Sequence, residues 1–139
     1  MSADAGGTTA YGYTAHLPDV PFDEARTRIT EALKQEGFGI LTEIDVKATL
    51  KKKIDQEFDR YVILGACNPH LAHRALLAEH AIGLLLPCNV CVWEDDGGST
   101  VAIARPDVMF GMVRNPALEP VMRDADERLR RALEAAAHQ

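Results

Sequence analysis

Hydrophobic residues recur with a helical period in one part of the N-terminal half of the chain and with a strand-like period around it. Four apolar residues at helical spacing predict a helix: Phe22, Ala25, Ile29 and Leu33. Gly37 stands where the glycine that follows a helix C-terminus is expected. Strands are predicted on either side of this helix, over residues 11–16 and 38–44.

The next segment has the pattern of an amphipathic surface helix. Asp45 is a good N-cap, and Val46, Leu50 and Ile54 then line one side. The opposite side carries a basic group: Lys47, Lys51, Lys52 and Lys53. We interpret these lysines as a solvated helix face, with an anion-binding patch as the alternative.

The middle of the chain predicts a central strand followed by a third helix. Residues 60–66 are apolar on both faces, as in a strand with neighbours on each side. Asn68 and Pro69 have the order of an N-cap and a first helical residue, so a helix is predicted from there to about residue 79.

The C-terminal half predicts a hairpin and a final helix. Residues 81–94 resemble a long strand interrupted by Pro87, residues 95–98 a tight turn, and residues 100–104 the return strand. Residues 105–114 are predicted to be irregular or a short strand. The last helix should begin near Pro120. Its acid–base pairs are four residues apart: Asp124–Arg128, Asp126–Arg130 and Glu127–Arg131.

The resulting order is β-α-β-α-β-α-β-β-α. It predicts an α+β, two-layer sandwich, with a mostly antiparallel sheet and helices on one face. Residues 1–9 are predicted to be a flexible tail, and residues 10–139 a single domain.

Composition narrows the classes of function. The net charge of −6 opposes binding of nucleic acid, because such binding depends on neutralising phosphates. The longest apolar stretch, residues 81–86, is far too short to span a membrane. The N-terminus has neither the basic region nor the apolar core of a secretory signal, so a cytoplasmic location is expected. Three cysteines in such a protein argue against a disulfide framework.

Cys67 is the first candidate functional residue. It closes the central strand and precedes the helix cap at Asn68, where the helix N-terminus would favour a thiolate and lower the thiol pKa. His70 and His73, in the start of the same helix, would supply charge or protons. The alternative is a buried cysteine that acts as a small hydrophobic residue.

Cys88 is the second candidate, because it follows the strand-breaking Pro87 and precedes Asn89. If Cys67 and Cys88 meet in the sheet, they form a dithiol, part of a metal site, or a packing contact. Cys91 completes a Cys-x-x-Cys sequence with Cys88, but strand alternation places these two side chains on opposite faces. We therefore do not interpret them as a redox pair.

Metal binding is a more specific alternative to a reactive thiol or a packing contact. The donor types of Cys67, Cys88, His70 and His73 suit zinc or copper, although their spacing matches no closed zinc module. His16, His80 and His138 are interpreted as surface histidines.

Two short motifs carry a resemblance to a known family. Gly65-Ala66-Cys67-Asn68-Pro69, and Leu84 through Pro87-Cys88-Asn89-Val90, resemble the family catalogued as domain of unknown function 302. The resemblance implies a two-layer fold related to that of the TATA-binding protein, in a small, dimeric prokaryotic protein. The family's motif carries over onto both segments. The family typically has an aliphatic residue at the position of Cys91, and the resemblance implies no activity.

The sequence therefore leaves three hypotheses for function. The first is a thiol-centred ligand-binding or redox module built on Cys67 and Cys88, whose ligand is a small molecule or a metal ion. The second is a structural or interaction module that forms a homodimer and catalyses nothing. The third is an enzyme, which we consider less fitting, with Arg105, Asp107 and Arg114 lining a substrate pocket.

Overall fold

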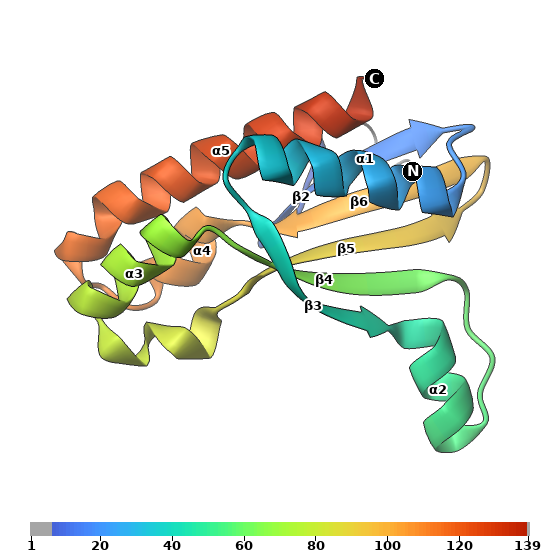
Figure 1. Cartoon of the computed structure of the whole chain (residues 1–139), viewed down its shortest axis with the longest axis horizontal. Coiled ribbons are helices and arrows are strands. Elements are labelled where there is room, and N and C mark those ends of the chain that lie inside the picture. Colours follow the sequence, from blue (N-terminus) through green and yellow to red (C-terminus); the bar gives the residue numbers. More distant parts are fainter. Residues whose placement is uncertain (1–6, 139) are drawn as a thin grey trace.

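The computed structural model describes residues 7–138 and contains one antiparallel sheet, in the order β1-β2-β6-β5-β4-β3 (Figure 1). The strands are β1 (Gly7–Thr8), β2 (Gly12–Pro18), β3 (Gly39–Asp45), β4 (Tyr61–Cys67), β5 (Cys88–Asp95) and β6 (Gly98–Ala104). The helices are α1 (Phe22–Gln35), α2 (Val46–Ile54), α3 (Pro69–Ala78), α4 (Pro106–Gly111) and α5 (Glu119–Ala137). Short 3-10 helices cover η1 (His80–Leu85) and η2 (Pro116–Leu118).

This arrangement confirms the predicted α+β class and the antiparallel sheet. The predicted element order is also confirmed, with additions that the sequence patterns did not predict. One addition is β1, which pairs with β2 and lies within the predicted tail. Residues 1–6 of that tail lie outside the described residues.

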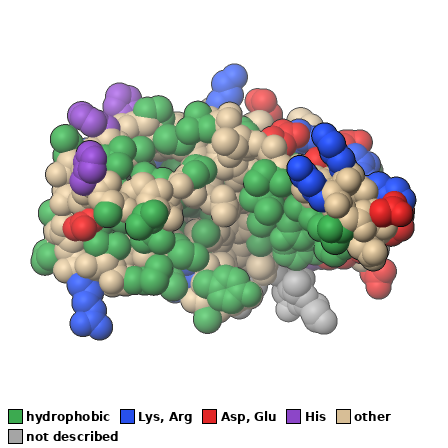
Figure 2. All heavy atoms as spheres, turned by 90° about the horizontal axis from the view of Figure 1, so that it is seen from below, with side chains coloured by type: hydrophobic (Ala, Val, Ile, Leu, Met, Phe, Trp, Pro, Cys, Tyr) green, Lys and Arg blue, Asp and Glu red, His purple; other side chains and the backbone are tan. Residues whose placement is uncertain are grey.

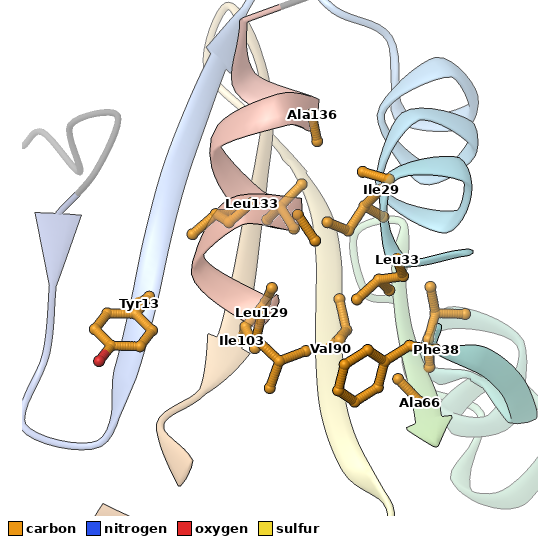
Figure 3. Close-up of a cluster of buried hydrophobic side chains, with 14 of the residues drawn as sticks. Tyr13, Ile29, Leu33, Phe38, Ala66, Val90, Ile103, Leu129, Leu133 and Ala136 are labelled. Atoms are coloured by element: carbon orange, nitrogen blue, oxygen red, sulfur yellow. The ribbon is translucent and has the colours of Figure 1, made fainter. Parts of the chain in front are cut away.

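The core lies between the sheet and the long helices α1 and α5. Both helices cover the same face of the sheet (Figure 1), and their apolar stripes meet there. Ile29 and Leu33 of α1 face Leu129 of α5 and Val90 of β5 (Figure 3). All four side chains are fully buried, so this layer supplies most of the hydrophobic stabilisation.

Two segments differ from their predicted structure. Residues 81–85, predicted as the start of a strand, belong to η1, in which only Ile82 is buried, and β5 begins after Pro87. The run of leucines there lacks the alternation of a half-buried strand, and Pro87 has no amide proton for a ladder. Residues 106–111, predicted as irregular or strand, form α4, with Pro106 at its first position.

Two helices differ in detail from expectation. The surface helix predicted there is present as α2, but its apolar side is not packed into the core, because no residue of α2 is buried. In α5 the first two predicted pairs are present, Asp124–Arg128 and Asp126–Arg130. The third is not, because Arg131 instead pairs with Glu36 at the end of α1. None of the described helices is long and apolar enough to cross a membrane.

Candidate functional site

A small cavity lies where β4 ends and β5 begins, beneath α3, α4 and α5. Its volume is about 30 Å³, and its walls are mainly apolar, with Phe38, Leu71, Leu86 and Phe110 among them. The exceptions are the thiols of Cys67 and Cys88 and the side chain of Asn68. The cavity therefore combines two soft sulfur atoms with apolar surroundings.

The pairing of β4 with β5 explains why the two cysteines meet. Ala66 lies opposite Cys88 in the ladder, so Cys67 and Cys88 occupy adjoining positions on neighbouring strands. Cys67 is the last residue of β4, and the chain leaves the sheet there to enter α3. Both side chains line the cavity, although strict alternation along two regular strands would separate them.

The pKa of the Cys67 thiol moves in the opposite direction to the one predicted. Burial raises the pKa of Cys67 rather than lowering it. Burial also raises the pKa of Cys88, to about 11, and a negative charge on the nearby Cys67 adds to this effect. Both cysteines are free thiols. Desolvation therefore opposes the thiolate that the sequence analysis expected at Cys67 in the unliganded protein.

Asn68 is a structural residue at the edge of the cavity. Its Oδ1 accepts hydrogen bonds from the backbone amides of His70 (3.1 Å) and Leu71 (3.2 Å), which confirms the predicted N-cap. Its Nδ2 donates to the carbonyl oxygen of Glu36 at 3.3 Å. With these contacts it joins the start of α3 to the end of α1 and leaves little capacity for a ligand.

Gly37 permits this junction between the helices. It has φ of 85°, as the predicted position after the C-terminus of α1 requires. A Cβ atom at Gly37 would lie 2.8 Å from Nδ2 of Asn68. The absence of a side chain therefore allows Asn68 to approach the backbone of α1.

The predicted histidine ligands do not join the cysteines. His70 and His73 are exposed on α3 and are not among the residues that line the cavity. Histidines stand at the surface at the end formed by α3 and η1 (Figure 2). Within residues 7–138 no group of three His, Cys, Asp or Glu side chains is placed to hold a metal ion. The predicted four-ligand set is therefore not assembled.

A wider groove of about 300 Å³ lies beside the cavity. Cys88, Leu86 and Phe110 line both spaces, while Asn89 and Met109 line the groove alone. Asn89 is exposed there. Cys88 therefore separates the cavity from a groove that is open to solvent.

Cys91 lies on the opposite face of the sheet from Cys88, as predicted. It pairs in the ladder with Ile63 and Ala102, and its thiol lies near the hydroxyl of Tyr61. The ring of Tyr61 in turn stacks on Trp93, with centroids 5.3 Å apart. Cys91 is therefore a natural reference thiol outside the cavity.

A polar cluster that no sequence pattern predicted lies on this second face. His16 was interpreted as a surface histidine, but it is half-buried, with Nδ1 3.1 Å from Oδ1 of Asp95 and 3.3 Å from Oγ1 of Thr100. These residues come from β2, β5 and β6, so only the sheet register reveals the cluster. His80 and His138 are exposed, as predicted.

The residues of the enzyme hypothesis do not converge. Arg105 and Asp107 form a two-bond ion pair, with distances of 3.0 and 2.7 Å. Arg114 lines a separate groove that neither of them lines. None of the three lines the cavity of Cys67, so the described residues give no substrate site that joins them to it.

Comparisons with known proteins identify relatives but no activity. The family model described as "Domain of unknown function DUF302" matches residues 13–136. The chain is also similar to the crystal structure of an uncharacterised conserved DUF302 protein from Bacillus stearothermophilus. The TM-score is 0.84 at 32% identity, over 92% of this chain and 99% of that one. No curated protein matches the chain.

Proposed function

Since this chain belongs to the DUF302 family, whose description assigns no activity, we propose its function from the geometry of the cavity. Cys67 and Cys88 act together as a thiol-centred ligand-binding module. The observation that carries this proposal is that two thiols from neighbouring strands line one small apolar cavity. A cytoplasmic location, which belongs to the same proposal, would keep both thiols reduced.

Ligand binding fits the site better than thiol redox chemistry. Attack on a disulfide requires a thiolate, and burial raises the pKa of both Cys67 and Cys88. A thiophilic ligand overcomes this difficulty because it replaces the protons as it binds. The two sulfur atoms then stay buried, and neither carries the charge of a free thiolate.

A small trivalent arsenical tests whether the two thiols act as a unit. Methylarsonous acid condenses with two thiols, forming two As–S bonds and releasing two water molecules. We expect one adduct per chain, mapped by mass spectrometry to Cys67 and Cys88 together. Cys67→Ser and Cys88→Ser should each abolish the bridged adduct, and Cys91→Ser should retain it. Bridging that survives either of the first two substitutions would exclude the proposal.

Homodimer formation is a second candidate function, favoured by an exposed segment that we call the arm, residues 39–60. It comprises β3, α2 and the connection to β4. Four of its large apolar side chains are exposed: Leu41 (68%), Ile44 (48%), Ile54 (61%) and Phe58 (45%). Hydrophobic side chains gather beside basic ones at the end of the molecule where α2 lies (Figure 2).

The helical part of the arm, α2, has little to stabilise it within one chain. A helix as short as α2 is marginal in water without tertiary packing, and no residue of α2 is buried. Its N-cap bond from Ala48 to Asp45 and the ion pairs of Lys51 with Asp55 and Glu57 are solvent-exposed. Such pairs contribute little. A second copy of the chain would cover the apolar residues.

Sedimentation of the purified protein tests this candidate. We expect a dimer for the natural sequence and a monomer for the double variant Ile54→Ser, Phe58→Ser. Leu77→Ser is the matched control, because Leu77 is 74% exposed on α3, outside the arm. A natural protein that stays monomeric at all concentrations would rule out the dimer.

A further inference from the structure

The thiol pair is suited to one particular class of ligand. We propose that the cavity binds a single soft monovalent metal ion, copper(I), between Sγ of Cys67 and Sγ of Cys88. This inference rests on the proposed function and specifies its ligand. It follows from the size of the cavity, the set of donors and the charge of the site.

The size of the cavity favours a ligand of very few atoms. A volume of about 30 Å³ leaves room for one small species, since roughly 10–15 Å³ is enough for a water molecule. Organic ligands of ordinary size occupy sites of roughly 300–1,000 Å³, an order of magnitude larger. The mainly apolar walls also offer few hydrogen-bond partners to water, whereas a bare ion that binds sulfur needs no such partners.

The donors select a soft monovalent ion rather than zinc. Structural zinc requires four converging ligands. The part of the chain that the structure describes brings no third His, Cys, Asp or Glu side chain to Cys67 and Cys88. Copper(I) prefers thiolate sulfur, and two thiolates suffice to hold it in linear coordination. Asn68 does not compete, because its side chain is engaged with the backbone of α1 and α3.

The charge of the complex suits the position of Cys67. Binding breaks two S–H bonds, forms two S–Cu bonds and releases two protons to solvent, while copper remains monovalent. The product carries one net negative charge. Cys67 precedes the N-cap of α3, a helix whose N-terminus has positive potential. That potential favours the bis-thiolate complex over two separate buried thiolates.

Competition with a chromogenic copper(I) chelator, under anaerobic reducing conditions, tests the inference with the full chain. We expect one equivalent of copper(I) per chain. Cys67→Ser and Cys88→Ser should each weaken binding at least about 100-fold, because each removes one of two ligands. Cys91→Ser should leave it within about threefold, because Cys91 lies on the other face of the sheet. Excess zinc should not displace the copper.

The pH dependence gives a second readout. While both thiols are protonated in the free protein, the affinity should rise about 100-fold per pH unit, since two protons leave for each ion bound. A dependence on one proton, or copper binding that survives either Cys67→Ser or Cys88→Ser, would overturn the inference. Arsenical bridging without copper binding would refute the ligand class and leave the thiol module intact. Failure of both would reject the module as well.

Discussion

Replacing Asn68 with alanine should destabilise the protein by about 1–2 kcal/mol, because it removes the N-cap of α3. Two backbone amides, of His70 and Leu71, lose their acceptor at 3.1 and 3.2 Å. The carbonyl oxygen of Glu36 loses the Asn68 donor but keeps Nη1 of Arg128, at 3.2 Å, so no orphaned acceptor adds to the cost. The loss in free energy of unfolding should therefore stay within the range expected for the removal of an N-cap alone.

Urea denaturation followed by circular dichroism measures this difference, with an unchanged denaturant slope as evidence that the unfolding transition is the same. Asn68→Asp preserves the cap acceptor and should lose less than Asn68→Ala. Asn89→Ala is the matched control, since Asn89 is exposed on β5, and should change stability by no more than about 0.5 kcal/mol. A loss below about 0.5 kcal/mol for Asn68→Ala, or equal losses for both substitutions, would refute the structural role assigned here.

Three further predictions concern stability. Gly37→Ala should cost at least about 1 kcal/mol in urea denaturation, because Gly37 has φ of 85° and the new Cβ would meet Asn68. Burial and the bond to Asp126 raise the pKa of Tyr13 to about 12, above its ordinary value near 10. The stability it contributes is complete below pH 10 and lost as the pH rises to about 12, so Tyr13→Phe should flatten this part of a pH–stability profile. Leu129→Ala should cost about 2–5 kcal/mol, and a smaller loss in calorimetry would contradict the central place of Leu129 in the core.

The helices and their ends were largely predictable, because their signals are local. The stripe of Phe22, Ala25, Ile29 and Leu33 is buried as predicted, and Asn68 caps its helix as its position before Pro69 indicated. Neither feature depends on knowing which distant segments are neighbours. The α4 helix shows the limit of such local signals. Pro106 is typical of a helix start, but α4 has only six residues, too few to show a helical period of apolar positions.

The site depends on information that is not local. The approach of Cys67 to Cys88 depends on the register of β4 against β5 and on the chain leaving the sheet at Cys67, neither of which any spacing in the sequence specifies. The pKa directions were also beyond sequence reasoning, because the helix start at Asn68 suggested a lowered value while burial raises it. Local patterns also could not show that the apolar side of the surface helix α2 stays unburied, since an apolar stripe does not say which surface covers it.

Trp93 is the chain's single tryptophan, and its place in the sheet determines what intrinsic fluorescence reports. Its indole stacks on Tyr61, beside Phe58 of the arm and on the face that α1 and α5 leave uncovered. Emission on excitation at the indole band therefore senses the arm and its surroundings, while circular dichroism senses mainly the helical layer. If the arm melts or associates separately from the core, the two optical signals will give different transitions. If they coincide, the arm and the core form one cooperative unit.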